Sequence, residues 1–140
     1  VAEPLQLRND ALFLTPTRDA YMGGGVRLTS RDFLKLAQMM MDGGRWNGKQ
    51  IVSAEWAKKS TSRLTTIGDS MYGYLWWLAD YPYNGRKVRA FFAAGNGGQI
   101  ALAIPDLDLA IAFTGGNYSD AAGRIPQRDL VPQDILPAVK

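Results

Sequence analysis

Apolar residues near the start of the chain recur at the spacing of an α-helix. Five of them fall at positions i, i+3, i+4, i+7 and i+8: Phe33, Leu36, Ala37, Met40 and Met41. This stripe predicts an amphipathic helix, with Thr29 as its N-cap and Asp32 completing an approximate capping box. Gly43 and Gly44 end the helix, because glycine readily takes the left-handed conformation at a helix C-terminus. Ser53 then has the position of an N-cap for a second, shorter helix.

In the second half of the chain the period of the pattern changes to two, which indicates strands. The aromatic-rich residues 72–78 and residues 88–94 form one predicted pair, and Asn84-Gly85 between them is a turn signal of the kind that closes hairpins. Residues 99–104 and 109–114 form a second predicted hairpin. An antiparallel sheet is therefore expected over this half of the chain.

The last two predicted strands alternate large with small apolar residues, rather than apolar with polar ones. One strand carries Ile100, Leu102 and Ile104 around Ala101 and Ala103, and the next carries Leu109, Ile111 and Phe113 around Ala110 and Ala112. A half-exposed antiparallel sheet would have one polar face, so both faces are expected to be covered. The alanine face would let a helix approach closely, which predicts a helix–sheet–helix sandwich.

These elements define an α/β chain in the broad sense, of the α+β kind, with an antiparallel sheet flanked by helices. We expect one partial domain, in which residues 1–66 supply a helical segment and residues 67–140 supply the strands and a short helix from about Gln127. Three or four strands leave an edge that must be paired or covered. The exposed sheet edge is therefore a candidate contact between two copies, and the chain is expected to be part of a larger body.

The composition excludes several kinds of chemistry. The 140 residues contain neither cysteine nor histidine, which removes Ser-His-Asp triads, cysteine nucleophiles, disulfides and zinc sites built from these residues. Carboxylates, lysine, tyrosine, hydroxyls and backbone groups remain. The formal net charge is only +3 and basic residues occur throughout the chain, so we expect no nucleic-acid partner. No run approaches the roughly 20 apolar residues of a membrane span.

Two groups of residues are candidates for a site. Tyr72, Trp76 and Trp77 belong to an aromatic cluster that more often fills a core or lines a pocket than stacks on bases, because basic residues do not alternate with it. The stretch 95–99, Gly-Asn-Gly-Gly-Gln, places glycines at a strand edge, where a ligand or another backbone can approach. Its backbone N–H groups can bind a developing oxyanion, although a plain bulge or tight turn explains the same spacing.

Several blocks, in their order along the chain, carry a resemblance to a known family. They are residues 22–33, 42–49, 55–56, 72–77, 93–99, 104–109 and 113–118. Together they resemble the C-terminal part of the serine β-lactamase-like family, in the branch of class C β-lactamases, DD-peptidases and the related esterases and amide hydrolases. The resemblance implies the C-terminal part of a β-lactamase/transpeptidase-like sandwich.

The family's catalytic motifs are only partly represented. Its nucleophile lies in Ser-x-x-Lys and its second motif is Tyr-x-Asn, and neither pattern occurs in this sequence. By the resemblance both belong to an N-terminal remainder upstream of Val1. The third motif, Lys-Thr-Gly or His-x-Gly, corresponds to Ala93-Ala94-Gly95, which lacks the cation.

The resemblance implies a serine hydrolase that works through an acyl-enzyme, acts on a small-molecule ester, amide or peptidoglycan-like substrate, and needs no cofactor. The N–H of Asn96, just after Gly95, would supply half of a backbone oxyanion hole. The implied substrate-binding residues are Ala93, Ala94, Gly97, Tyr72, Trp76 and Trp77. Because Ala93 can neither relay a proton nor attract a substrate carboxylate, ester or amide hydrolysis is favoured over penicillinase activity.

The 140 residues by themselves are expected to be inactive, since the nucleophile is not among them. The alternative is a non-catalytic binding or scaffold module that keeps the family's fold, which the loss of the cation at Ala93 favours. The family's habit favours a bacterial extracytoplasmic location.

Overall fold

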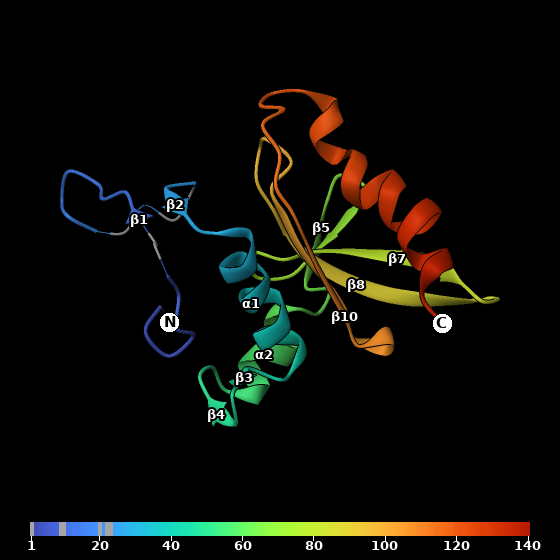
Figure 1. Ribbon diagram of the computed structural model, residues 1–140, viewed down its shortest axis with the longest axis horizontal. Coiled ribbons are helices and arrows are strands. Elements are labelled where there is room, and N and C mark those ends of the chain that lie inside the picture. The colour runs from blue at the N-terminus through green and yellow to red at the C-terminus, as the bar shows by residue number, and fades with distance from the viewer. Residues whose placement is uncertain (1, 9–10, 20, 22–23) are drawn as a thin grey trace.

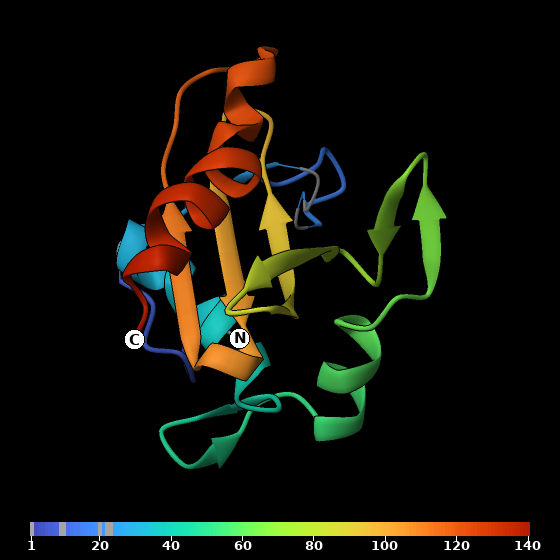
Figure 2. The same ribbon diagram turned by 90° about the vertical axis from the view of Figure 1, so that its right-hand side faces the viewer.

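Six antiparallel strands form the central sheet. The computed structural model describes residues 2–8, 11–19, 21 and 24–140. The strands are β5 (Thr65–Ile67), β6 (Ser70–Tyr72), β7 (Trp77–Tyr83), β8 (Arg86–Ala94), β9 (Ile100–Ile104) and β10 (Leu109–Phe113). Their order is β10-β9-β8-β7-β6-β5, so each strand pairs with its neighbours in the chain and the two edges are β10 and β5. Figure 2 shows the β5–β6 hairpin projecting away from the other strands.

Helix α1 (Ser30–Met41) confirms the helix expected from the apolar stripe. The Thr29 hydroxyl accepts a hydrogen bond from the Asp32 N–H at 3.2 Å, which is the expected N-cap. Gly43 and Gly44 follow the helix with φ of 65° and 81°. These angles lie in the left-handed region, where glycine ends a helix without steric cost.

A short hairpin and a second helix connect α1 to the sheet. Strands β3 (Arg45–Trp46) and β4 (Lys49–Gln50) pair antiparallel. Helix α2 (Ala54–Ser60) begins at the expected cap, where the Ser53 hydroxyl accepts a hydrogen bond from the Trp56 N–H at 3.2 Å. The predicted second helix is therefore confirmed.

The two faces of the sheet are covered by different helices, as the alternation of large and small residues predicts. Ala101 and Ala103 are fully buried in a cluster with residues of α1. The large side chains of β9 pack on the opposite face against the C-terminal helices η3 (Pro126–Ile135) and η4 (Leu136–Ala138). Figure 1 shows α1 and η3 on opposite sides of the sheet. The expected α+β class and helix–sheet–helix sandwich are confirmed.

The strand predicted over residues 72–78 is wrong in its middle, because residues 73–76 form a turn between β6 and β7. The Gly73 N–H donates to the Trp76 carbonyl oxygen at 2.8 Å. A Cβ at Gly73 would overlap the carbonyl oxygen of Ser60, so the end of α2 presses directly against this turn. The break comes from the approach of α2, which a pattern within one segment does not report.

The C-terminal helix η3 begins at Pro126, close to the expected start at Gln127, but it is a π-helix with Pro132 inside it. It is preceded by a single 3₁₀ turn, η2 (Ala121–Arg124). The Tyr81 hydroxyl of β7 donates to the Gln127 carbonyl oxygen at 2.6 Å. Burial raises the pKa of Tyr81 to about 12, so the phenol stays neutral and holds the helix on the sheet. Among the described residues no helix is long and apolar enough to cross a membrane.

The N-terminal residues lie along α1 and are held by its buried carboxylate. The Asp32 carboxylate pairs with Lys35 Nζ at 2.6 Å and accepts a hydrogen bond from the Arg8 N–H at 2.8 Å. These two contacts, the lysine first, lower the pKa of Asp32 to about 2. Strands β1 (Ala11–Leu12) and β2 (Val26–Arg27) pair in a separate arm, beside α1 and away from the sheet (Figure 1).

Candidate functional site

The glycine-rich loop 95–99 joins β8 to β9 at the upper end of the sheet in Figure 1. The Gly95 N–H donates to the Gln99 carbonyl oxygen at 2.8 Å, and the Gly98 N–H donates to the Gly95 carbonyl oxygen at 3.2 Å. Gly98 has φ of +88°, which favours glycine at this corner. The backbone groups of Gly95 therefore point inward, across the mouth of the hairpin.

The N–H of Asn96 points the other way. Ala94 precedes Gly95 in the extended strand and faces away from β9. The Gly95 carbonyl oxygen points inward to the Gly98 N–H, and in a trans peptide the following N–H points the opposite way, so the Asn96 N–H also faces away from β9. In the part of the chain that the structure describes, the Asn96 N–H has no hydrogen-bond acceptor. Both residues are exposed. A free backbone donor therefore faces solvent at the end of β8.

The edge of β8 beside this donor is unpaired. The ladder between β7 and β8 ends at the Trp77–Phe92 pair. The residue that would come opposite Ala94 is Leu75, which lies in the turn before β7, with φ of +63° and a side chain that is 76% exposed. The last residues of β8 thus present an open strand edge that leads directly to the Asn96 N–H.

The connection after β10 braces the loop from outside. The Asn117 N–H donates to the Gly97 carbonyl oxygen at 3.0 Å, and the Ser119 N–H donates to Asn96 Oδ1 at 3.3 Å. A Cβ at Gly115 would lie 2.5 Å from the Gly97 carbonyl oxygen. The two segments are therefore packed backbone against backbone, which holds the loop in place.

The side chain of Gln99 completes the brace. Its Oε1 accepts a hydrogen bond from the Gly97 N–H at 3.0 Å. Its Nε2 donates to the Gly115 carbonyl oxygen at 2.6 Å and to the Tyr118 hydroxyl at 3.3 Å. Sequence reasoning assigned no role to Gln99 or Tyr118. The available signal was a long amide next to glycines, but its partners lie 16 and 19 residues further along the chain.

The three aromatic residues expected to line the site lie on two faces of the sheet. Tyr72 and Trp77 are opposite each other in the ladder, with ring centroids 4.6 Å apart, and Trp77 packs on the η3 side. Trp76 packs edge-on against Phe91, at 5.1 Å between centroids, within the cluster on the α1 side. All three predicted residues are half-buried. Only Tyr72 and Trp77 share a surface.

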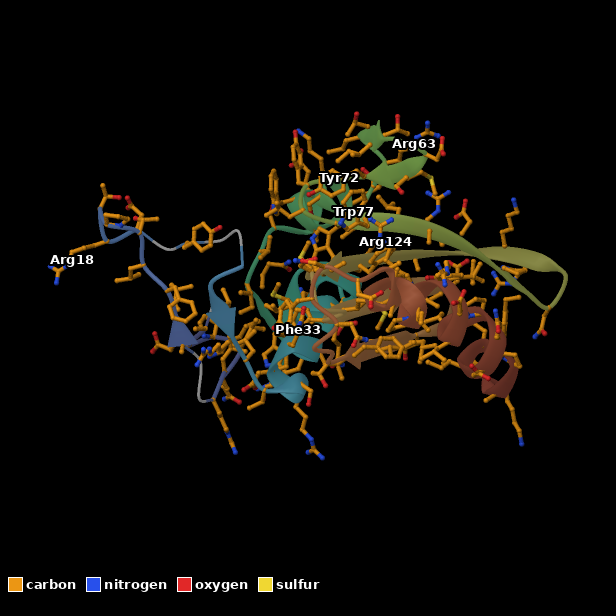
Figure 3. The ribbon with its side chains drawn as sticks, turned by 90° about the horizontal axis from the view of Figure 1, so that it is seen from above. Arg18, Phe33, Arg63, Tyr72, Trp77 and Arg124 are labelled. Carbon is orange, nitrogen blue, oxygen red and sulfur yellow. The ribbon has the colours of Figure 1, made fainter. Side chains whose placement is uncertain are left out.

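The nearby positive charge comes from another part of the chain than the motif predicts. Ala93 is half-buried near the end of β8 and brings no charge. Arg124 is exposed, follows Gly123, which packs against Gly98, and has no ion-pair partner among the described residues. The side chains of Arg124 and Trp77 are labelled in Figure 3, where they overlap in the view from above. The sequence signal for this arginine was weak, because it lies in a different segment.

Two depressions of the surface lie elsewhere. One, of about 250 Å³, is beside the middle of β8 and is lined by Lys58, Arg89 and Asp106 among others. A second is lined by residues 3–6 and 49–51. Neither includes the loop 95–99. The described residues also contain no group of three carboxylates that could hold a metal ion. The loop therefore presents the Asn96 N–H at the unpaired edge of β8, on the side that faces away from β9.

Comparison with known proteins supports the fold. The arrangement of an antiparallel sheet with α1 on one face and η3 on the other also occurs in a solved structure. A solved structure with this likeness is a Bacillus anthracis protein assigned as a 6-aminohexanoate-dimer hydrolase, with a TM-score of 0.60 and 21% sequence identity. The match covers 81% of this chain and 30% of that one. No family model matches the chain.

Proposed function

We propose that this chain is the C-terminal, oxyanion-binding part of a β-lactamase-like serine hydrolase that works through an acyl-enzyme. The observation that carries the proposal is the Asn96 N–H. It has no acceptor within the described residues, while Gly95, Gly97 and Gly98 in the same loop all donate to partners. A free backbone donor that faces away from β9, in a loop held by hydrogen bonds to another segment, suits one half of an oxyanion hole.

The chemistry assigns this donor a definite task. When a serine attacks a carbonyl, the carbonyl oxygen gains negative charge, and donors about 2.7–3.1 Å from that oxygen stabilise it. Asn96 supplies one donor, and the N–H of the nucleophile supplies the second. The nucleophile and its lysine and tyrosine belong to an N-terminal remainder. The coverage supports this division, because the chain spans 30% of the length of its structural neighbour.

The substrate in this proposal is an ester or amide. The open edge at Ala94 can pair with an extended amide substrate, and Tyr72 and Trp77 supply an apolar wall beside it. The name of the structural neighbour, a hydrolase of an amide dimer, supports the same choice. The absence of a cation at Ala93 argues against efficient penicillinase or carboxypeptidase activity.

The test is to remove the Asn96 N–H in the complete reading frame. Asn96→Pro deletes the donor, and kcat for an ester or amide substrate should fall by about 10²–10³, the usual effect of losing one oxyanion donor. Asn96→Ala keeps the N–H and should lose far less. Equal losses in the two variants would contradict the proposal.

The reading frame also separates catalysis from scaffolding. Ser-x-x-Lys and Tyr-x-Asn upstream of Val1 are expected in a hydrolase, and their absence would favour the binding module. The 140 residues alone should turn over neither p-nitrophenyl esters nor nitrocefin. Clear turnover by this chain would overturn the assignment of its site.

A further inference from the structure

Gln99 occupies space that two glycines leave open. A Cβ at Gly95 would lie 2.6 Å from Gln99 Oε1, and a Cβ at Gly97 would lie 2.6 Å from Gln99 Nε2. Neither glycine has a positive φ, so backbone conformation does not explain them. A Cβ at either glycine would displace the Gln99 amide from this place, and at Gly97 it would also lie 3.0 Å from the Tyr118 ring.

The hydrogen bonds of this amide require its two ends to differ. Oε1 faces an N–H, that of Gly97, and Nε2 faces a carbonyl oxygen, that of Gly115. Reversing the amide would bring donor against donor and acceptor against acceptor. A carboxylate would face the Gly115 carbonyl oxygen with a second acceptor, and an apolar side chain would leave both backbone groups without partners.

The amide engages the donor that follows the Asn96 N–H in the loop. The Gly97 N–H is the neighbour of the Asn96 N–H, and it is engaged only through the Gln99 side chain. The same side chain reaches Gly115 and Tyr118, and thereby ties the loop to the segment after β10. Without it, the peptide units after Asn96 lose their link to that segment, and the free donor is no longer preorganised.

We infer that Gln99 is the positioning residue of this site: its side-chain amide holds the loop so that the Asn96 N–H faces away from β9 at the end of β8. This inference rests on the proposed function for its catalytic meaning. The conformational part of the inference, that Gln99 holds the loop in place, can be measured without catalysis.

The first measurement is amide hydrogen exchange by NMR in the 140-residue chain. Gln99→Met removes both ends of the amide at nearly unchanged size, and exchange at Gly97 should rise about tenfold, as expected for one lost hydrogen bond. Gln38→Met is the matched control, since Gln38 is exposed on α1 and should leave Gly97 unchanged. Unchanged exchange at Gly97 in Gln99→Met would overturn the inference.

The second measurement uses Gln99→Glu as a pH-dependent rescue. A protonated carboxyl has one acceptor and one O–H donor, as the amide does, whereas the ionised form has only acceptors. The hydrogen bond to the Gly115 carbonyl oxygen should therefore be present at low pH and be lost as the introduced carboxyl ionises, and the NMR signals of residues 115–118 should shift with it. Signals of residues 115–118 that do not change with pH in this variant, with the wild-type chain also constant, would overturn the inference.

In the complete enzyme, Gln99→Met should lower kcat about tenfold or more with little change in KM, because an oxyanion donor acts in the transition state. A loss confined to thermal stability, with kcat intact below the melting temperature, would overturn the positioning role. Failure of the proposed function has a different signature: Asn96→Pro would leave kcat unchanged, while the exchange results at Gly97 would still stand.

Discussion

Strand β8 has a turn at each end, and the two turns are built on different principles. Asn84-Gly85, which joins it to β7, has φ of 47° and 77°, the two positive values of a tight hairpin turn. A Cβ at Gly85 would meet nothing within 4 Å. The loop 95–99 instead depends on contacts with residues 115–123. One turn is specified by its own two residues, and the other by a remote segment.

The difference favours the loop 95–99 over the Asn84-Gly85 turn as the candidate site. The conformation of the Asn84-Gly85 turn follows from its own two residues, so contacts with other segments are not needed to hold it. A loop held by hydrogen bonds and glycine contacts from another segment can keep a backbone donor unpaired, because the surrounding structure carries the cost. The contrast predicts unequal responses to substitution at the two ends of β8.

The largest effect is expected at Gly115. Its φ is not positive, but a Cβ there would lie 2.5 Å from the Gly97 carbonyl oxygen and 3.3 Å from backbone atoms of Gly98. Gly115→Ala should lower the free energy of unfolding by about 1–3 kcal/mol through overpacking, and should shift the NMR signals of the loop 95–99. Gly116→Ala is the control, since a Cβ there meets nothing within 4 Å. Equal free energies of unfolding in urea for Gly115→Ala and Gly116→Ala would contradict the close packing of the two segments.

A smaller and strictly local effect is expected at the other turn. Gly85→Ala places a Cβ on a residue with φ of +77°, and should cost about 1 kcal/mol in the free energy of unfolding. Asn84→Gly should cost less, because glycine tolerates positive φ at the neighbouring position. Signals of the loop 95–99 should stay in place in both variants. A shift in that loop would show that the two ends of β8 are coupled.

The smallest effect concerns the bond from Ser119 to Asn96. Asn96→Ala removes the Oδ1 that accepts the Ser119 N–H at 3.3 Å, and should cost about 0.5 kcal/mol, the low end for one exposed hydrogen bond. The direct readout is faster amide exchange at Ser119. Asn96→Asp keeps an acceptor oxygen at this position and should keep the protection. Equal exchange rates at Ser119 in Asn96→Ala and Asn96→Asp would show that this hydrogen bond does not help to hold the loop 95–99.

Much of the fold was predictable because its determinants lie within a few residues of each other. Thr29 and Asp32 specify the start of α1 through one cap, and Asn84-Gly85 specifies a hairpin through the φ values that these residues tolerate. The large–small alternation of β9 indicated two covered faces, and even the close approach of a helix to the alanines. The position of the glycine-rich stretch at a strand end was also predictable.

Other features were decided only by the tertiary structure. The turn at 73–76 exists because α2 presses on Gly73. The same turn brings Tyr72 opposite Trp77, whereas a continuous strand would put Tyr72 on the face of Trp76. The Gln99 amide acquires its partners only when the sheet brings Gly115 beside it.

The physical reason is the separation along the chain between the residues that interact. Caps, turns and periodic burial follow from sterics and hydrogen bonds within a single turn or strand, so the sequence by itself determined them. Which N–H stays without a partner depends on every segment that packs around it, and only the assembled sheet brings those segments together.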